Sequence, residues 1–265
     1  MKDLLIAERL HDDIDSLRQS FLFNEPFNHV CIDDFFQPAI AHALAAEIEA
    51  AAPNWHRYQN AIEIKQTCNL WNEFPSLTYK AFSYLTSDEF VSYLREMTGY
   101  KDLVADVGLH GGGLHRHGRG GKLNTHLDYS IHPKTGMQRK LNLIVYLSQD
   151  WDPSWGGGLG LWSHDADNNK PAKVEKVIDC LFNRGVLFDT TQNSLHGLPD
   201  PIECAENRFR SSIAVYYMVP PAKDASAHDR ALFAPHNEQA MDPAVMELIR
   251  MRSASATAAG VYRTK

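Results

Sequence analysis

Apolar and polar residues alternate with two different periods along the 265-residue chain, one in the first hundred residues and one after them. Residues 1–20 place leucine and isoleucine at helical spacing and predict an amphipathic helix. A short apolar run at 29–36 predicts a strand, and residues 38–51 predict a second helix that begins at a proline. Residues 76–99 predict two more helices, the last of which ends at a glycine.

From about residue 101 the pattern changes to short runs of β-branched and aromatic residues, separated by Gly, Pro, Asn and Asp. The clearest runs are 103–110, 122–130, 140–148, 159–163, 185–190 and 211–219. Many short strands at this spacing are typical of an all-β barrel or double sheet. A polar stretch follows, and then a helix predicted at 242–253, with Asp242 as its N-cap.

We expect a single domain over residues 1–265, built from three segments. Residues 1–100 supply supporting helices and a strand, residues 101–220 form the β core, and residues 221–265 form a C-terminal tail with one helix.

Composition and charge limit the classes of binding partner and the cellular compartment that we expect for this protein. The formal net charge is −7 and the Lys and Arg residues are spread out, which argues against nucleic-acid binding. No run of about 18 apolar residues occurs and the N-terminus has no apolar signal-peptide core, so neither a membrane span nor secretion is expected. The four cysteines are scattered, which favours reduced thiols, with a disulfide as the alternative. We therefore expect a cytoplasmic protein.

Candidate metal chemistry begins with His126 and Asp128, which lie two residues apart in a predicted strand. Residues with this spacing on a strand point to the same face, so both side chains can reach one metal ion. A second pair with the same spacing, His11 and Asp13, lies in the predicted first helix, where the side chains point roughly 200° apart. We interpret that second pair as part of a solvated helix face.

A third ligand is needed to complete a metal site. Two imidazoles and one carboxylate form the facial triad that binds Fe(II) and leaves coordination positions open. The best candidate is His196, because it follows the apolar run 185–189 and precedes a strongly strand-like run. Further histidines, interpreted as loop or rim residues, occur at 110, 115, 117, 132 and 164.

That strand-like run, 208–218, predicts a carboxylate clamp. As a strand it places Arg210, Ser212 and Tyr216 on one face and mostly apolar residues on the other. A guanidinium beside a hydroxyl inside a barrel can bind a carboxylate through several donors. Arg208 shares this face and is an alternative clamp.

The run 140–148 alternates in the same way and places Asn142 and Tyr146 on the face opposite its leucines. The Tyr146 phenol could donate a hydrogen bond to a carboxylate inside the barrel, and a buried structural tyrosine is the alternative.

These elements, in this order, resemble the Fe(II)/2-oxoglutarate-dependent dioxygenase superfamily, and most closely its prolyl-hydroxylase-like branch. The resemblance runs from about residue 103 to 218 and includes HLD, LNLIVYLSQDW, GGGLGLW, NRGVLFDT, LHG and RSSIAVYYM. It implies a mainly β fold with flanking helices around a double-stranded β-helix core, of the jelly-roll or cupin-like kind.

The resemblance assigns roles to residues that strand geometry brings together, and it alone implies the roles of Leu159 and Tyr216. The residues expected to bind the metal and act in catalysis are His126, Asp128 and His196. The residues expected to bind 2-oxoglutarate are Arg210, Ser212, Tyr146, Asn142 and Leu159. Tyr216 is expected to lie near the iron. The interval from His196 to Arg210 is longer than usual in the branch, which keeps Arg208 open as the clamp.

The implied activity is hydroxylation of a C–H bond of a small molecule or peptide residue, with Fe(II), 2-oxoglutarate and O2 as cofactors and succinate and CO2 as products. Asp128 favours hydroxylation, because related halogenases lack this carboxylate and bind a halide in its place. Desaturation, epimerisation or ring formation would use the same ligands and stays open. A non-catalytic metal-binding jelly-roll module and a zinc or manganese enzyme without a 2-oxo acid stay open as well.

A substrate-binding loop is predicted at 110–122, HGGGLHRHGRGGK, because glycines there suggest mobility near the cavity mouth. Its basic residues, chiefly His115, Arg116 and Arg119, are expected to attract an anionic substrate, with Tyr216 close by. The alternative is a solvated loop with no role in substrate binding.

Overall fold

The computed structural model describes residue 6 and residues 9–51, 53–223, 225, 228 and 230–261. Its helices are α2 (Arg9–Asp12), α3 (Ile14–Phe23), α4 (Pro38–Ala50), α5 (Ser76–Leu85), α6 (Asp88–Thr98), α7 (Pro243–Arg252) and α8 (Ser255–Val261). Its strands are β1 (His29–Ile32), β2 (His56–Gln59), β3 (Glu63–Cys68), β4 (Val104–Ala105), β5 (Gly113–His117), β6 (Lys122–Leu123), β7 (His126–Leu127), β8 (Gln138–Tyr146), β9 (Leu159–Asp165), β10 (Lys170–Ile178), β11 (Gly185–Asp189), β12 (His196–Gly197), β13 (Arg210–Val219) and β14 (Leu232–Phe233).

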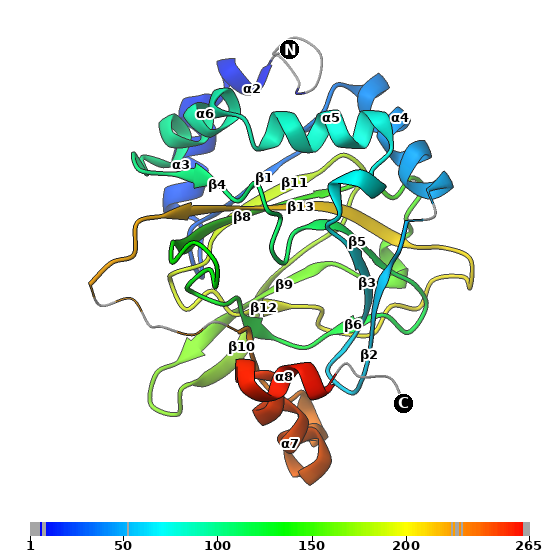
Figure 1. The fold of residues 1–265 in the computed structure, drawn as a ribbon, viewed down its shortest axis with the longest axis vertical. Coiled ribbons are helices and arrows are strands. Elements are labelled where there is room, and N and C mark those ends of the chain that lie inside the picture. The colour runs from blue at the N-terminus through cyan, green and yellow to red at the C-terminus, as the bar shows by residue number, and fades with distance from the viewer. Residues whose placement is uncertain are drawn as a thin grey trace.

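Two antiparallel sheets face each other at the centre of the molecule (Figure 1). The larger, nine-stranded sheet has the order β1-β11-β8-β13-β5-β3-β2, with β4 beside β13 and β6 beside β3. The smaller sheet has the order β10-β9-β12-β7-β14. Figure 1 shows α4, α5 and α6 over the outer face of the larger sheet and α7 and α8 below the smaller one. The predicted mainly β fold with flanking helices is confirmed.

Strand β13 separates an apolar core from the space between the sheets. Ile213, Val215 and Tyr217 pack with the helices in the larger core cluster. Arg210 and Ser212, on the opposite face of the strand, line a cavity between the sheets. Since side chains alternate along a strand, one strand supplies both the core and the site.

Helix ends follow the predicted local chemistry in the first hundred residues. Helix α4 begins at Pro38, and the Ser87 hydroxyl caps α6 by accepting the Phe90 N–H. Gly99 ends α6 in the left-handed conformation, at φ 79°. None of the described helices is long and apolar enough to span a membrane. The four cysteines are free thiols, as expected.

The predicted helix over residues 1–20 is wrong as a continuous element. The chain breaks it at Asp13 into α2 and α3, and before α2 the backbone of Ile6 bridges that of Phe36. Leu10 and Phe21, one from each helix, are buried in the same core. Residues 1–5, 7 and 8 lie outside the described part of the chain.

The run 103–110 forms only the two-residue strand β4. Beyond it the Asp106 carboxylate accepts hydrogen bonds from the backbone N–H groups of Gly108 and His110, at 3.0 and 2.9 Å. An aspartate that satisfies its neighbours' donors in this way competes with strand pairing, and a turn results.

Candidate metal centre and adjoining cavity

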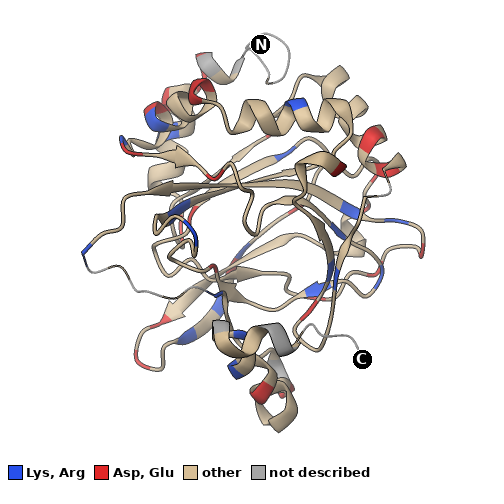
Figure 2. Cartoon of the chain, viewed as in Figure 1, with Lys and Arg blue, Asp and Glu red and all other residues tan. Residues whose placement is uncertain are grey.

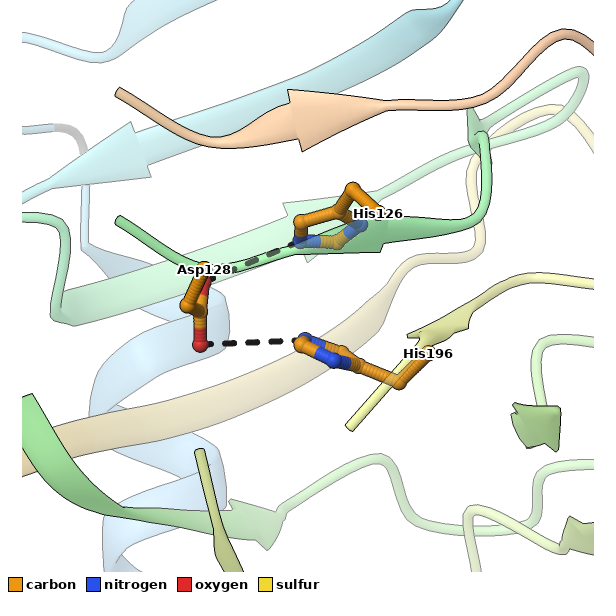
Figure 3. Close-up of side chains that lie close together, drawn as sticks. All are labelled: His126, Asp128 and His196. Carbon is orange, nitrogen blue, oxygen red and sulfur yellow. Dashed lines mark ion pairs between the residues drawn. The ribbon is translucent and has the colours of Figure 1, made fainter. Parts of the chain in front are cut away.

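Three side chains that the sequence singles out converge between the sheets. His126 on β7, Asp128 just after it and His196 on β12 each offer a ligand atom, and these atoms lie within 4.8 Å of one another. The Nε2 atoms of His126 and His196 lie 3.8 Å from the two different carboxylate oxygens of Asp128. Figure 3 shows the three side chains pointing toward one another. The described parts of the chain contain no other such cluster of three His, Cys, Asp or Glu ligands.

Backbone pairing brings the two histidines together. His126 and His196 are direct partners where β7 and β12 meet. Gly197 makes this approach possible, because a Cβ there would lie 2.8 to 2.9 Å from the backbone of residues 123–125. The Nδ1 atoms of the two histidines lie 3.0 Å from the Asn124 carbonyl and 2.7 Å from the Ser194 carbonyl. These bonds hold the proton on Nδ1 and leave Nε2 free for a metal.

The protonation states of the cluster suit metal binding. Burial, and then the neighbouring His196, lower the pKa of His126 to about 3, which keeps its imidazole neutral. Burial alone would raise the pKa of Asp128, but Arg139 and the two imidazoles outweigh burial and lower it. A neutral imidazole and an ionised carboxylate are the forms that bind metal ions.

Arg139 is a functional candidate that the sequence-based prediction missed. One of its terminal nitrogens lies 3.4 Å from an Asp128 oxygen, and the other donates a 2.7 Å hydrogen bond to the His110 carbonyl. Its guanidinium lies between the rings of Tyr129 and Tyr216, 3.3 and 3.2 Å from their centroids. The Tyr216 hydroxyl also donates to Asp128, at 3.2 Å.

A β-bulge explains why strand alternation did not identify Arg139. In the pairing of β8 with β13, Tyr217 faces Leu141 and the adjacent Met218 faces Arg139, so Lys140 is an extra residue. An extra residue reverses the side-chain alternation on one side of it. Arg139 therefore faces the cavity, although uninterrupted strand alternation would place it on the same face as the core-facing Leu141 and Leu143.

The triad opens into a cavity of about 390 Å³ between the sheets. Predicted residues that line it are His115, Asn142, Leu159, Ser212 and Tyr216, together with Arg210. Tyr146 packs in the adjoining core cluster, and its ring lies 4.6 Å from the Arg210 guanidinium carbon.

Arg210 and Arg208 have different surroundings. Arg210 is buried in the cavity wall, and its Nε donates a 2.6 Å hydrogen bond to the Gly157 carbonyl. Arg208 is half-buried outside this cavity, where it donates to the Gln149 carbonyl at 2.5 Å and lies over the Trp155 ring. The geometry therefore favours Arg210 as the clamp.

Several buried polar atoms near Arg210 have no hydrogen-bond partner in the protein. They are the Tyr146 hydroxyl, Nε2 of His115 and both ring nitrogens of His117, which pairs with Arg210 across β5 and β13. Burial lowers the pKa of His115 to about 3 and that of His117 well below its usual value, so both are neutral. Buried polar groups are normally satisfied, so this end of the cavity has the donors and acceptors for a polar ligand.

The prediction of a mobile loop at 110–122 is wrong. Residues 113–117 form β5, an interior strand that pairs with β13 and β3. Gly113, at φ 98°, is required there because a Cβ would lie 2.2 Å from the Cys68 carbonyl oxygen, not because the segment moves. The sequence signal was ambiguous, since glycine marks both loops and close backbone approaches.

The predicted roles of Arg116 and Arg119 do not agree with where these residues lie. Arg116 projects from the face of β5 opposite to His115, and its guanidinium lies 4.1 Å from the Trp55 ring and 4.5 Å from the Phe209 ring. Arg119 lies with it in a separate outer depression, and neither residue lines the metal cavity. For Arg116 the physical reason is strand alternation in β5, while Arg119 lies in the turn after that strand.

Residues outside the predicted β core also complete the cavity. The His228 imidazole lies 2.9 Å from the Asp128 carbonyl oxygen, and the Phe233 ring is stacked on His126 at 4.9 Å between centroids. Lys65, on β3, lines the cavity from the N-terminal part of the chain. No motif in the sequence connects these residues to the triad, because their contacts depend on tertiary packing.

Comparisons with known proteins find one family profile and several similar folds. Residues 112–218 match the sequence profile described as the 2OG-Fe(II) oxygenase superfamily. No curated protein matches the chain at a significant level.

Solved structures share the fold. A Pseudomonas putida prolyl-4-hydroxylase is 16% identical with a TM-score of 0.53, and the match covers 79% of this chain and 100% of that one. A Trichoplax adhaerens prolyl hydroxylase, in complex with a hypoxia-inducible-factor peptide, is 16% identical with a TM-score of 0.54, covering 80% and 94%. HygX from Streptomyces hygroscopicus, with nickel and 2-oxoglutarate bound, is 14% identical with a TM-score of 0.51, covering 77% and 87%.

Proposed function

We propose that the chain is a 2OG-Fe(II) oxygenase, the superfamily whose profile its residues 112–218 match, and that it hydroxylates a C–H bond of a small-molecule or peptidyl substrate. Its cofactors are Fe(II), 2-oxoglutarate and O2, and the co-products are succinate and CO2. The observation that carries this proposal is the buried triad of two imidazoles and one carboxylate, which opens into a cavity that contains Arg210.

The donor set fits a ferrous ion. Nε2 of His126, Nε2 of His196 and one oxygen of Asp128 would hold the metal on one side and leave the cavity side open. Fe(II) with 2-oxoglutarate and O2 supplies the oxidising chemistry, while the protein supplies binding, orientation and exclusion of water. Tyr216 and Arg139 hold the Asp128 carboxylate in place for this task.

The cavity end around Arg210 fits the distal carboxylate of 2-oxoglutarate. The guanidinium is fixed by Gly157 and by the Tyr146 ring, so little side-chain entropy remains to be lost on binding. Ser212 and the unpaired Tyr146 hydroxyl are further donors, and Leu159 supplies an apolar wall. Asn142 lies between this end and the triad, and its amide donates toward Asp128 at 3.4 Å.

The test of the metal assignment is Fe(II)-dependent conversion of 2-oxoglutarate to succinate. His126→Ala, Asp128→Ala and His196→Ala are each expected to lose this turnover and anaerobic Fe(II) binding, because each removes one of three ligands. His164→Ala is the matched control, since His164 lies on β9 outside the cavity lining and its ring bonds to the exposed Asn169. Unchanged Fe(II) binding in His196→Ala would refute the assignment.

The test of the co-substrate assignment compares the two arginines. Arg210→Ala is expected to raise the KM for 2-oxoglutarate by more than tenfold, because a charge-assisted hydrogen bond contributes roughly 1.5–3 kcal/mol. Arg208→Ala should leave this KM within about twofold of wild type, because Arg208 lies outside the cavity. The reverse ranking would move the clamp to Arg208.

A further inference from the structure

The metal cavity is rich in positive charge within an acidic protein. The Lys and Arg residues that line it are Lys65, Arg139, Arg210, Arg230 and Arg252. Asp128 is the one carboxylate among the described residues that line it, while the whole chain has a net charge of −7. Figure 2 shows Lys and Arg on strands in the middle of the molecule, and many Asp and Glu residues on peripheral helices and loops.

The proposed cofactors do not remove this excess of positive charge. A divalent iron and a doubly charged 2-oxoglutarate cancel each other, so loading both leaves the balance of the cavity unchanged. Arg210 is assigned to the co-substrate and Arg139 to Asp128. Glu63, which is fully buried, lies 3.3 Å from the Lys65 ammonium and 3.2 Å from Nε of Arg252. Lys65 therefore shares the Glu63 carboxylate with Arg252.

Lys65 lines the same cavity as the triad and Arg210. It comes from β3, which pairs with β5, and its side chain is 15% exposed. Thr67, which lies on the same face of β3 as Lys65, pairs with His115 of β5, and all three residues line the cavity. Lys65 therefore faces the same space as His115.

Arg230 supplies a second cation on another wall of the cavity. It belongs to the segment that leads into β14, and its charge lowers the pKa of His110, for which burial is the main cause. His110 and Arg230 both line the cavity, as does Arg139. Cations from β3 and from the C-terminal segment therefore border the same cavity.

We propose that the substrate is an anion, with a carboxylate or phosphate group that Lys65 binds inside the cavity and Arg230 attracts from the opposite segment. This inference rests on the proposed oxygenase function and assigns its substrate class. Binding the acidic group at Lys65 holds a neighbouring C–H bond of the substrate beside the triad. It replaces the sequence-based assignment of the anion to Arg116 and Arg119, which lie outside the cavity.

The first test uses sulfate as the probe anion, because it coordinates metals weakly. Sulfate is titrated calorimetrically at constant ionic strength into protein loaded with Mn(II) and N-oxalylglycine, an unreactive analogue of 2-oxoglutarate. Lys65→Met is expected to weaken sulfate binding about tenfold or more, since a bond to a charged group is worth roughly 1.5–3 kcal/mol. Glu63 keeps its Arg252 partner in this variant, so the fold is retained. Lys80→Met, at an exposed position on α5, is the matched control.

The second test identifies the acidic group. Wild-type protein with Fe(II), 2-oxoglutarate and O2 is screened for succinate release with carboxylic acids against their primary amides, and with phosphate monoesters against their alcohols. Stimulation by the acid but not by its neutral partner, with a KM that rises about tenfold or more in Lys65→Met, supports the inference.

The results distinguish failure of the anionic substrate class from failure of the proposed oxygenase activity. Sulfate binding that is equal in wild type and Lys65→Met, or stimulation by neutral partners as strong as by the acids, overturns the anionic substrate class alone. Uncoupled succinate release without substrate shows in each case that the oxygenase is intact. Absence of any succinate from wild type overturns the proposed function and the substrate class together.

Discussion

At the scale of single residues, Arg139 decides how the Asp128 carboxylate is presented to a metal. The guanidinium lies between Tyr129 and Tyr216 and is tied to the His110 carbonyl, so its position is fixed by packing. From there it contacts an Asp128 oxygen at 3.4 Å. Groups that orient a metal ligand in this way commonly change metal affinity when they are removed.

Arg139→Gln is therefore expected to weaken Mn(II) binding about 10- to 100-fold, measured by anaerobic titration. The control is Arg184→Gln, which removes another Arg–carboxylate pair, between Arg184 and Asp33, that does not line the metal cavity. Loss of thermal stability in Arg139→Gln with unchanged Mn(II) affinity would mean that Arg139 only supports packing.

At the scale of elements, β5 depends on one glycine. Gly113 has φ 98°, and an added Cβ would meet the backbone of Cys68 at 2.2 Å where β5 runs beside β3. Gly113→Ala is expected to destabilise the protein well beyond the roughly 1–2 kcal/mol of left-handed strain alone, measured by denaturant unfolding. Gly120→Ala is the matched control, because Gly120 has φ 72° but no atom within 4 Å of an added Cβ. Equal losses in both variants would show that β3 moves away without cost.

The same scale shows which elements a sequence can predict. Strands β8, β11 and β13 are apolar on at least one face and were predicted as strands. The facing residues of β8 and β13 were predicted as well, because burial on one face imposes a period of two. Strand β3 has the sequence EIKQTC and was missed, because it borders a polar cavity instead of a core. The bulge at Lys140 has no sequence signal either, and it determines where Arg139 points.

At the scale of the whole molecule, the site is assembled from both sheets and from the two ends of the chain. The triad belongs to the smaller sheet, while Arg210 and Asn142 belong to the larger one. The triad residues and Arg210 could be singled out from the sequence because each lies within a short motif on or directly beside a strand. Lys65 and Phe233 were not, since no motif near either residue links it to the triad, and only tertiary packing brings them to the cavity.

The C-terminal segment encloses the metal side of the cavity through Phe233. The Phe233 ring stacks on the His126 ring with an angle of 23° between their planes. The backbones of the two residues pair where β14 meets β7, and the Phe233 side chain packs with Ile62 and Val245. Through Val245 it also holds α7, and Arg252 at the end of α7 pairs with Glu63. The Phe233 side chain therefore connects β7, which carries His126, with the turn before β3 and with α7.

Phe233→Ala is expected to loosen this segment before the rest of the protein, because truncating a buried phenylalanine costs roughly 3–5 kcal/mol and the lost contacts are local. Amide hydrogen exchange should accelerate over residues 230–252 and at β7, while β8 and β13 keep the wild-type rates. Metal affinity should fall as well, because His126 loses the ring that fixes its plane. Met241→Ala, in the same segment but 85% exposed, should change neither property. Faster exchange spread evenly over both sheets would instead show that the C-terminal segment unfolds only with the whole molecule.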